Sequence, residues 1–367
     1  MPRLNASPCD AMCVKHCMQL IVSHRRGNCK SITIIILSIL VLALYFLYSF
    51  HSNQKKLFQY YILDEVSNTS SKYASFEFTI NEEKKCSREA PFLVMLVISH
   101  PSESKTRHAI RSTWGGVREV HYGKEQLLGV LTLFLLGIPA SMSIQAAVET
   151  ESHIHKDIVQ QNFVDSYRNL TLKVLMGMQW VSRYCPRAKY VLKTDSDMFV
   201  NVDLLVTSVL QPGLPPRMEY FAGYYMQAAR PRREPSSKWY MSQHQYLLDV
   251  YPPYCSGTAY TFSSDLSAKI LQASQNLPLL PLEDVYMGLC LNWLGIHPSA
   301  NSLFHIEYIN YSPCRYKHLV SSHGVTPDKL LLYWKGVQGA SDVHCDSLFL
   351  WLKETLCIFW PCQGSSL

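Results

Sequence analysis

The chain has 367 residues, of which 48% are hydrophobic and 17% are charged, and its formal net charge is +6 at pH 7. This composition excludes a largely disordered chain and is sufficient for one large folded domain with attached segments. Basic residues do not form a run interleaved with aromatic residues, which excludes nucleic acid as a favoured partner.

The first feature along the chain is an uncharged run at residues 31–50, rich in Ile, Leu and aromatic residues. A helix of this length spans the hydrocarbon core of a bilayer. A cleaved signal peptide is the alternative, but its apolar region would be shorter and would be followed by a small-residue cleavage pattern. Basic residues are more frequent before the run than directly after it. The positive-inside rule therefore predicts a cytoplasmic tail at 1–30, a signal anchor and a lumenal remainder.

The cysteines and glycosylation sequons are interpreted within this topology. We expect unmodified thiols before the anchor, with palmitoylation of Cys29 or a metal site at the other cytoplasmic cysteines left as alternatives. The cysteines after the anchor would lie in an oxidising compartment, where eight of them allow 105 disulfide pairings that the sequence does not distinguish. The lumenal sequons mark three candidate glycosylation sites, Asn68, Asn169 and Asn310.

The segments after the anchor predict a stem and then a folded domain. Residues 51–88 mix polar and charged residues without a sustained period, which indicates a stem, and we assign 89–367 to the catalytic domain. A continuous apolar run at 91–98 predicts a strand buried on both faces. The pattern becomes helical over 103–114, and a second buried strand is predicted at 131–136.

The rest of the domain continues the alternation of helices and strands. A long helical stretch is expected at 146–183, broken near 168–170, and is followed by a strand that ends at Asp195. Short strands are predicted at 220–225 and 258–262. Alternation of this kind predicts an α/β fold with a mostly parallel central sheet.

The strand that ends at Asp195 carries a metal-binding pattern, Asp195-Ser196-Asp197. Side chains two residues apart on an extended segment point the same way, so both carboxylates can face one divalent cation. An acidic turn that only faces water is the alternative reading. Ligands bind at the carboxyl ends of strands in open α/β sheets, and that position favours the metal site.

A polar and aromatic loop follows at 230–254 and contains Lys238, Trp239 and Tyr251 as candidates for binding an acceptor. Aromatic rings set among polar groups suit stacking on sugar faces. Surface tyrosines and loop prolines are also ordinary packing material, so both interpretations stay open.

A second acidic element, Glu283-Asp284, opens an apolar stretch. Acids in the first turn of a helix are stabilised by the helix dipole, which is the alternative explanation. Together with the first pair, however, Asp284 completes the requirements for group transfer from a nucleotide sugar, because it can serve as a base for the acceptor hydroxyl. Glu283 is a further acceptor-side candidate. No glycine-rich phosphate loop is present, so a cation is expected to carry the diphosphate charge.

Several motifs in this order resemble those of the Golgi β-1,3-glycosyltransferases, and most closely the β-1,3-galactosyltransferases. The resemblance covers roughly residues 91–334, and its motifs lie at 107–115, 134–137, 165–173, 251–258 and 283–285.

The resemblance implies a GT-A fold, a UDP-sugar donor, Mn²⁺ as the cation and inversion at the anomeric carbon. It implies that Asp197 ligates the metal, that Asp195 contributes to the nucleotide and metal site, and that Asp284 is the base. His323 is similar to a late histidine of the family that completes the metal shell. Donor positioning would fall to a helical group, with helix packing as the alternative: Arg107, Arg111 and Trp114.

One position departs from the family pattern, because many relatives have three successive acids where this chain has Ser196. This variant, with the residues at 255–258, is similar to one subgroup and favours transfer of galactose from UDP-galactose onto a terminal N-acetylglucosamine. Transfer of N-acetylglucosamine or N-acetylgalactosamine on the same scaffold is the alternative, and a silent glycan-binding Golgi protein is another. The implied setting is a single-pass Golgi membrane protein that binds a glycan acceptor, with a homodimer left open.

Overall fold

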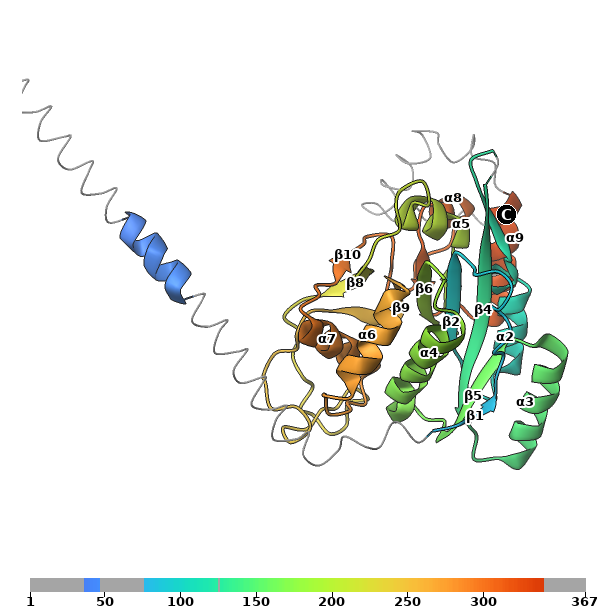
Figure 1. Ribbon diagram of the computed structural model, residues 1–367, viewed down its shortest axis with the longest axis horizontal. Coiled ribbons are helices and arrows are strands. Elements are labelled where there is room, and N and C mark those ends of the chain that lie inside the picture. The colour runs from blue at the N-terminus through green and yellow to red at the C-terminus, as the bar shows by residue number, and fades with distance from the viewer. Residues whose placement is uncertain (1–35, 47–75, 125, 340–367) are drawn as a thin grey trace, which may run out of the picture. The chain divides into compact units, whose positions relative to one another are not determined.

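The computed structural model describes residues 36–46, 76–124 and 126–339 (Figure 1). The chain divides into two units, 1–64 and 65–367. In the first unit, residues 36–46 form a helix with exposed side chains. Among the described residues, no helix is both long and apolar enough to cross a membrane. The flanks of the predicted anchor, the cytoplasmic cysteines and Asn68 lie outside the described residues.

The second unit is built on a sheet with nine strands in its described part, ordered β1-β5-β4-β2-β6-β9-β8-β10, with β3 paired to β4. Strand β2 is central and every one of its residues is buried, as expected for a strand covered on both faces. The strands are β1 Phe78–Ile80, β2 Leu93–Ile98, β3 Glu119–Tyr122, β4 Gln126–Ile138, β5 Ile158–Val164, β6 Tyr190–Asp195, β8 Phe221–Met226, β9 Tyr254–Ser263 and β10 Ser299–Ala300.

The prediction of a mostly parallel sheet is correct only for the centre. Strands β5, β4, β2 and β6 run parallel to one another. Strand β9 pairs antiparallel with both β6 and β8, and the edge strands β1 and β3 are also antiparallel to their neighbours. The sheet is therefore mixed, because β9 reaches the sheet next to β6 from the opposite direction.

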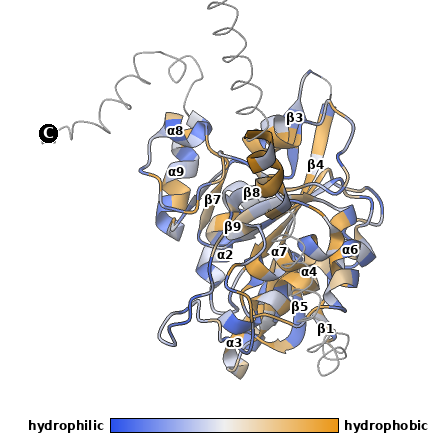
Figure 2. Cartoon of the chain, turned by 90° about the vertical axis from the view of Figure 1, so that its left-hand side faces the viewer, coloured by the Kyte–Doolittle hydropathy of each residue, from blue (hydrophilic) through white to orange (hydrophobic). Residues whose placement is uncertain are grey.

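Helices cover both faces of this sheet. Helices α4, α6 and α7 pack together on one face, and α2, α3 and α9 lie on the other (Figure 1). Gly177 lets α4 approach the sheet, because a Cβ there would lie 2.6 Å from a methyl carbon of Leu135. Figure 2 shows hydrophobic residues along much of β4 and of helix α4. The longer helices are α2 Ser104–Arg111, α3 Met142–His155, α4 Leu170–Tyr184, α6 Asp265–Ser274, α7 Glu283–Leu294 and α9 Pro327–Gly339.

Short elements complete the domain and bring one distant segment to the sheet end. Strand β7, Met198–Val200, follows β6 and pairs antiparallel with β11, Ser321–His323. The remaining short elements are the 3₁₀ turns η1 Trp114–Gly116 and η2 Tyr167–Asn169, the helices α5 Val202–Leu204 and α8 Pro313–Lys317, and the π-helical segment η3 Leu205–Leu210.

The helical stretch predicted at 146–183 restarts near 168–170 as expected, but its middle is wrong, because strand β5 lies between α3 and α4. Its polar residues conceal the strand in the sequence. Gln160 is buried, and its amide donates to Gly137 O at 2.9 Å and to Gln145 Oε1 at 3.0 Å. A polar residue satisfied in this way can occupy the core without the apolar pattern on which the prediction depended.

The folded domain also begins before the predicted boundary at residue 88. Strand β1 pairs with β5, and Cys86 forms a disulfide with Cys185 at the end of α4. Residues 76–88, which we assigned to the stem, therefore belong to the domain. Cys255 and Cys290 are buried free thiols, and Cys314 is disulfide-bonded as well.

Candidate active site

The first acidic pair lies at the carboxyl end of the central parallel strands. Asp195 is the last residue of β6, and its neighbour in register on β2 is Ile98. Asp197 lies in the turn between β6 and β7 and is exposed. Ser196 between them donates a hydrogen bond to Glu103 Oε2 at 3.0 Å, which connects the turn to the segment that follows β2. The predicted position of the pair outside a strand end is confirmed.

Pairing of β11 with β7 brings His323 to Asp197, with Nε2 of the imidazole 3.1 Å from Oδ2 of the carboxylate. Burial acts to raise the pKa of Asp197, but the hydrogen bond and charge of His323 outweigh it and lower that pKa. The same hydrogen bond raises the pKa of His323. Two residues 126 positions apart thus offer an oxygen and a nitrogen ligand side by side.

Lys193, which the sequence analysis did not single out, connects the two acidic elements. Its Nζ lies 2.8 Å from Asp195 Oδ1 and 3.1 Å from Glu283 Oε2, and it also donates to the carbonyl of Gly257. Burial acts to lower the pKa of Lys193, but the two carboxylates raise it, so the ammonium stays charged. A lysine in an otherwise apolar strand was the sequence signal for this role.

Asp284 is held at the first turn of α7 by two backbone amides. Val285 N donates to its Oδ1 at 2.9 Å and Gly257 N donates to its Oδ2 at 3.2 Å. Burial raises the pKa of Asp284, and these hydrogen bonds oppose the rise. A raised pKa improves a carboxylate as a base. Gly257 is needed here, since a Cβ would lie 3.0 Å from Glu283 Oε2.

A cavity of about 580 Å³ adjoins Asp284 and is lined by residues of the predicted acceptor loop. Trp239 and Tyr251 both line it, so the structure brings two acceptor candidates to the same cavity as the predicted base. Arg233 holds the loop by donating four hydrogen bonds of 2.8 to 3.0 Å to backbone carbonyls between 241 and 248. The loop therefore forms one wall of this cavity, and its backbone is held in place by hydrogen bonds.

Two other acceptor candidates lie elsewhere. Lys238 does not line the cavity, and its Nζ lies over the rings of Trp239 and Tyr167 at 4.9 and 5.8 Å. Glu283 is only 5% exposed, and its carboxylate contacts Lys193 and the hydroxyl of Tyr260. The placement of Glu283 does not support contact with an acceptor, because both oxygens have internal partners.

The three donor-positioning candidates make internal contacts that favour the alternative of helix packing. Arg107 is fully buried and forms an ion pair with Glu151 at 2.7 Å. Arg111 forms ion pairs with Glu151 at 2.7 Å and with Asp157 at 2.8 Å. Trp114 is also fully buried, and its Nε1 donates to the carbonyl of residue 198 at 3.0 Å. These side chains pack inside the domain and support the turns around the site.

The two described sequons differ in their packing. The amide of Asn169 donates to Val164 O at 2.8 Å, and the buried hydroxyl of Thr171 donates to Leu280 O at 2.6 Å. Asn169 is partly exposed, and its glycosylation stays a prediction. Asn310 is exposed and its placement is compatible with the prediction.

Comparison with known proteins identifies the family of this chain. A family model described as galactosyltransferase matches residues 105–302. The chain belongs to the galactosyltransferase family. It is 46% identical over 271 residues to β-1,3-galactosyltransferase 1 of Homo sapiens, covering 74% of this chain and 81% of that one. It is 44% identical over 271 residues to β-1,3-galactosyltransferase 2 of Mus musculus, covering 72% of this chain and 62% of that one. The predicted membership of the β-1,3-galactosyltransferases is confirmed.

Family membership identifies an enzyme of the galactosyltransferase class. Among solved structures, the WbbM bifunctional glycosyltransferase aligns with a TM-score of 0.34 at 12% identity, over 64% of this chain and 45% of that one. That likeness is too low to bear on the site.

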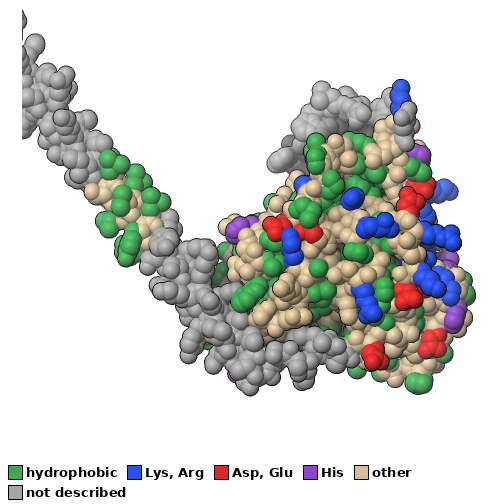
Figure 3. All heavy atoms as spheres, viewed as in Figure 1, with side chains coloured by type: hydrophobic (Ala, Val, Ile, Leu, Met, Phe, Trp, Pro, Cys, Tyr) green, Lys and Arg blue, Asp and Glu red, His purple; other side chains and the backbone are tan. Residues whose placement is uncertain are grey.

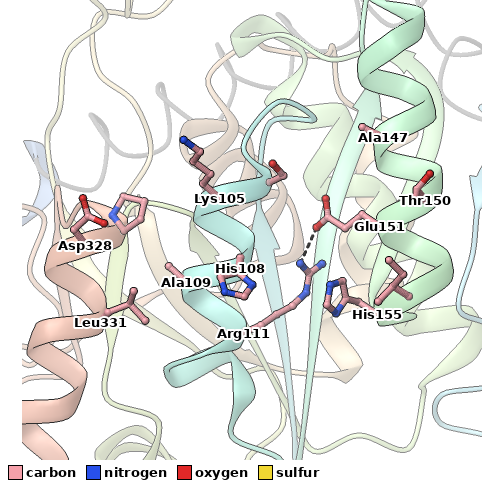
Figure 4. A pocket seen from close by; sticks show the side chains of 13 residues that line it. Lys105, His108, Ala109, Arg111, Ala147, Thr150, Glu151, His155, Asp328 and Leu331 are labelled. Carbon is pink, nitrogen blue, oxygen red and sulfur yellow. Dashed lines mark ion pairs between the residues drawn. The ribbon is translucent and has the colours of Figure 1, made fainter.

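The galactosyltransferase domain has a second, larger cavity of about 800 Å³ between α2, α3 and α9 (Figure 4). It is lined by Lys105, His108 and Arg111 together with Glu151, whose ion pair with Arg111 appears in the figure. Lys and Arg side chains gather on this side of the domain (Figure 3). None of the three predicted catalytic or metal-binding aspartates lines this cavity, whereas Asp284 lines the smaller one.

Proposed function

We propose that the protein transfers galactose from UDP-galactose to the 3-hydroxyl of a terminal N-acetylglucosamine, with inversion at the anomeric carbon. The observation that carries the proposal is the connection through Lys193, which joins Asp195 at one strand end to the start of α7, where Asp284 faces a cavity. Donor-side acids and a separate base thus belong to one site. The GT-A fold and a single-pass type II Golgi topology, with its anchor at 31–50, are parts of the same proposal.

The donor set suits Mn²⁺. Asp197 and His323 would hold the cation through carboxylate oxygen and imidazole nitrogen, and Asp195 would complete the acidic side of the site. Bound there, Mn²⁺ would neutralise the charge that develops on the departing diphosphate. Among the described residues no group of three or more His, Cys, Asp or Glu side chains already has metal-site geometry, so a metal titration is part of the test.

In the proposed reaction, Asp284 accepts the proton of the acceptor hydroxyl while that oxygen forms a bond to the anomeric carbon. The bond from this carbon to the diphosphate oxygen breaks, and UDP leaves with the electron pair. Attack from the face opposite the leaving group inverts the configuration. The hydrogen bonds from the amides of Val285 and Gly257 hold the carboxylate of Asp284 in one orientation for accepting the proton.

The choice of donor and acceptor rests on the sequence around the site. Ser196 and residues 255–258 resemble the type 5 subgroup of β-1,3-galactosyltransferases. N-acetylglucosamine or N-acetylgalactosamine transfer is the competing proposal, and a screen of UDP-sugars with mass analysis of the product distinguishes them.

The test uses the full-length chain in detergent, with UDP-galactose and a β-N-acetylglucosamine glycoside. We expect turnover only with Mn²⁺ present, and loss of at least about 1,000-fold in kcat for Asp284→Asn with UDP binding retained. Asp328→Asn, an exposed acid on α9, serves as the matched control. Full activity of Asp284→Asn would exclude it as the base. A Mn²⁺ titration of Asp197→Ala that matches the parent would exclude Asp197 as a ligand.

A further inference from the structure

The cavity beside Asp284 is lined by two arginines, Arg230 and Arg232. Both side chains are exposed. Within the described part of the chain, neither guanidinium has a hydrogen-bond or ion-pair partner, whereas Arg233 next to them has four. The two free guanidinium groups therefore face a cavity in which their charge is not balanced by a paired carboxylate.

The backbone that carries these arginines is fixed on both sides. Met241 N donates to Arg232 O at 2.9 Å, and Tyr251 N donates to Ala229 O at 2.8 Å. Together with the carbonyls bound by Arg233, these bonds hold the segment against the rest of the loop. A fixed backbone reduces the entropy lost when the side chains bind a ligand.

Tyr251 adds a second, independent observation. It is 5% exposed and lines the same cavity, and its buried hydroxyl has no hydrogen-bond partner among the described residues. An unsatisfied buried hydroxyl is unfavourable by roughly 1–3 kcal/mol, so such a group in a native protein calls for an explanation, and a bound polar ligand would provide its partner. The hydroxyl of Tyr251 is therefore a second kind of polar group on this cavity that a ligand could pair with.

We propose that the acceptor carries an oxyanion, a sulfate ester or a carboxylate, on or next to the accepting sugar, and that Arg230 and Arg232 bind it. This inference rests on the proposed function, because it takes the cavity beside Asp284 as the acceptor site. Planar guanidinium groups match the geometry of sulfate and carboxylate oxygens. Asp197 and His323, the proposed ligands on the donor side, do not line this cavity. Acceptor binding is thus favoured over binding of the donor diphosphate.

The experiment measures KM and kcat of the full-length chain in detergent, at fixed Mn²⁺ and UDP-galactose, for three acceptors. These are a neutral β-N-acetylglucosamine glycoside, the same glycoside with a 6-sulfate, and the glycoside joined to a carboxylate-bearing sugar. We expect KM for at least one anionic acceptor to be about tenfold lower than for the neutral one, as a charged hydrogen bond provides. Preference for only one of the two anionic acceptors identifies the source of the oxyanion.

Variants assign the effect to the two arginines. Arg230→Gln with Arg232→Gln is expected to remove the preference and leave KM for the neutral acceptor within about twofold, since only a charged hydrogen bond is lost. Arg187→Gln is the matched control, because Arg187 is exposed at the turn between α4 and β6, away from the carboxyl ends of the strands. Unlike the double variant, it is expected to keep the preference.

Equal KM values for neutral and anionic acceptors in the parent would overturn the inference. A rise in KM for UDP-galactose in the double variant, with the acceptor preference intact, would also overturn it, because the arginines would then bind the donor. Absence of turnover with every acceptor would overturn the proposed function instead. Calorimetric binding of the same three acceptors to the parent then decides the oxyanion preference separately.

Discussion

Lys193 is the residue on which the two acidic elements converge. It is 3% exposed and contacts Asp195, Glu283 and the carbonyl of Gly257. A buried cation with two carboxylate partners fixes their separation, because moving either carboxylate would leave charge unpaired in a site of low dielectric constant.

Replacement of Lys193 by Met should therefore lower both stability and activity. We expect the free energy of unfolding to fall by about 3 kcal/mol, because the buried carboxylate of Glu283 and the partly exposed one of Asp195 lose their cation. We expect kcat to fall about 100-fold, because Asp195 and the start of α7 lose their common support. Denaturant unfolding and steady-state kinetics measure the two effects.

Lys173→Met is the matched control, since Lys173 is also buried and forms an ion pair with Asp165 at 2.8 Å. It should destabilise by a similar amount with a smaller loss of kcat. Equal losses of kcat in the two variants would contradict the role given to Lys193.

Glu283 predicts a particular dependence of stability on pH. Burial raises its pKa to about 7, although Lys193 opposes the rise. A carboxyl with a raised folded-state pKa contributes stability below its unfolded pKa, and this contribution is lost as pH rises through about 7. The parent should lose up to about 3 kcal/mol from this group between pH 4 and pH 8, and Glu283→Gln should lose less. Unfolding midpoints across that range provide the measurement, and parallel curves for the two proteins would contradict it.

Sequence reasoning at the residue scale succeeded where a local pattern determined the geometry. The positions of Asp195 and Asp197 at a strand end were predictable, because the apolar residues before them indicate a strand and because side chains in a strand alternate with a period of two. The meeting of Asp197 with His323 was expected only from family resemblance, because strand pairing between distant segments leaves no local pattern. The partners of Arg107 and Arg111 lie more than 40 residues away, so their packing role needed the fold.

At the scale of elements, the approach of β9 to α7 positions Asp284, the proposed base. Gly257 on β9 lies so close to the helix that a Cβ would be 3.0 Å from Glu283 Oε2 and 3.4 Å from Asp284 Cβ. Gly257→Ala should therefore displace the start of α7 and lower kcat by about tenfold or more, with a change in stability below about 2 kcal/mol.

Gly177→Ala provides the contrasting variant. Its Cβ would lie 2.6 Å from Leu135 Cδ1 and 2.9 Å from Leu96 Cδ1, within the core under α4. Overpacking there should lower stability by about 1–3 kcal/mol and largely spare kcat of the folded protein. If both glycine variants lost activity only in proportion to stability, the specific role of Gly257 would be refuted.

Element prediction failed where burial and polarity were combined. Strand β5 contains buried Gln160 and Gln161, so its residues did not resemble a core strand. The antiparallel insertion of β9 was also hidden, because the direction of a short strand is decided by the length and path of the preceding loop. The helix at 104–111 was predicted over 103–114, and the start of the helix at 283–294 was anticipated only as the alternative explanation of its acidic first turn.

At the scale of the whole molecule, the Cys86–Cys185 disulfide joins the entry of the domain to the end of α4 across 99 residues. Cys86→Ser is expected to lower the free energy of unfolding by about 2–5 kcal/mol, mainly through the greater freedom of the unfolded chain. Thermal unfolding under non-reducing conditions measures it, with Cys290→Ala, a free buried thiol, as the comparison.

Alkylation of the denatured, unreduced protein checks the pairing itself. Mass analysis should find Cys255 and Cys290 modified, and Cys86 and Cys185 unmodified until reduction. Modification of Cys86 before reduction would refute the bridge.

The hydrogen bonds of Arg233 have a consequence for how such enzymes diversify. Because one guanidinium closes the loop onto its own carbonyls, the wall of the cavity is held largely independently of the strand ends that carry Asp195 and Asp197. If the acceptor binds in this cavity as proposed, substitutions along that wall should alter which glycan is accepted and leave the transfer chemistry intact. Exchange of residues 229–251 between two relatives should therefore exchange their acceptor preferences.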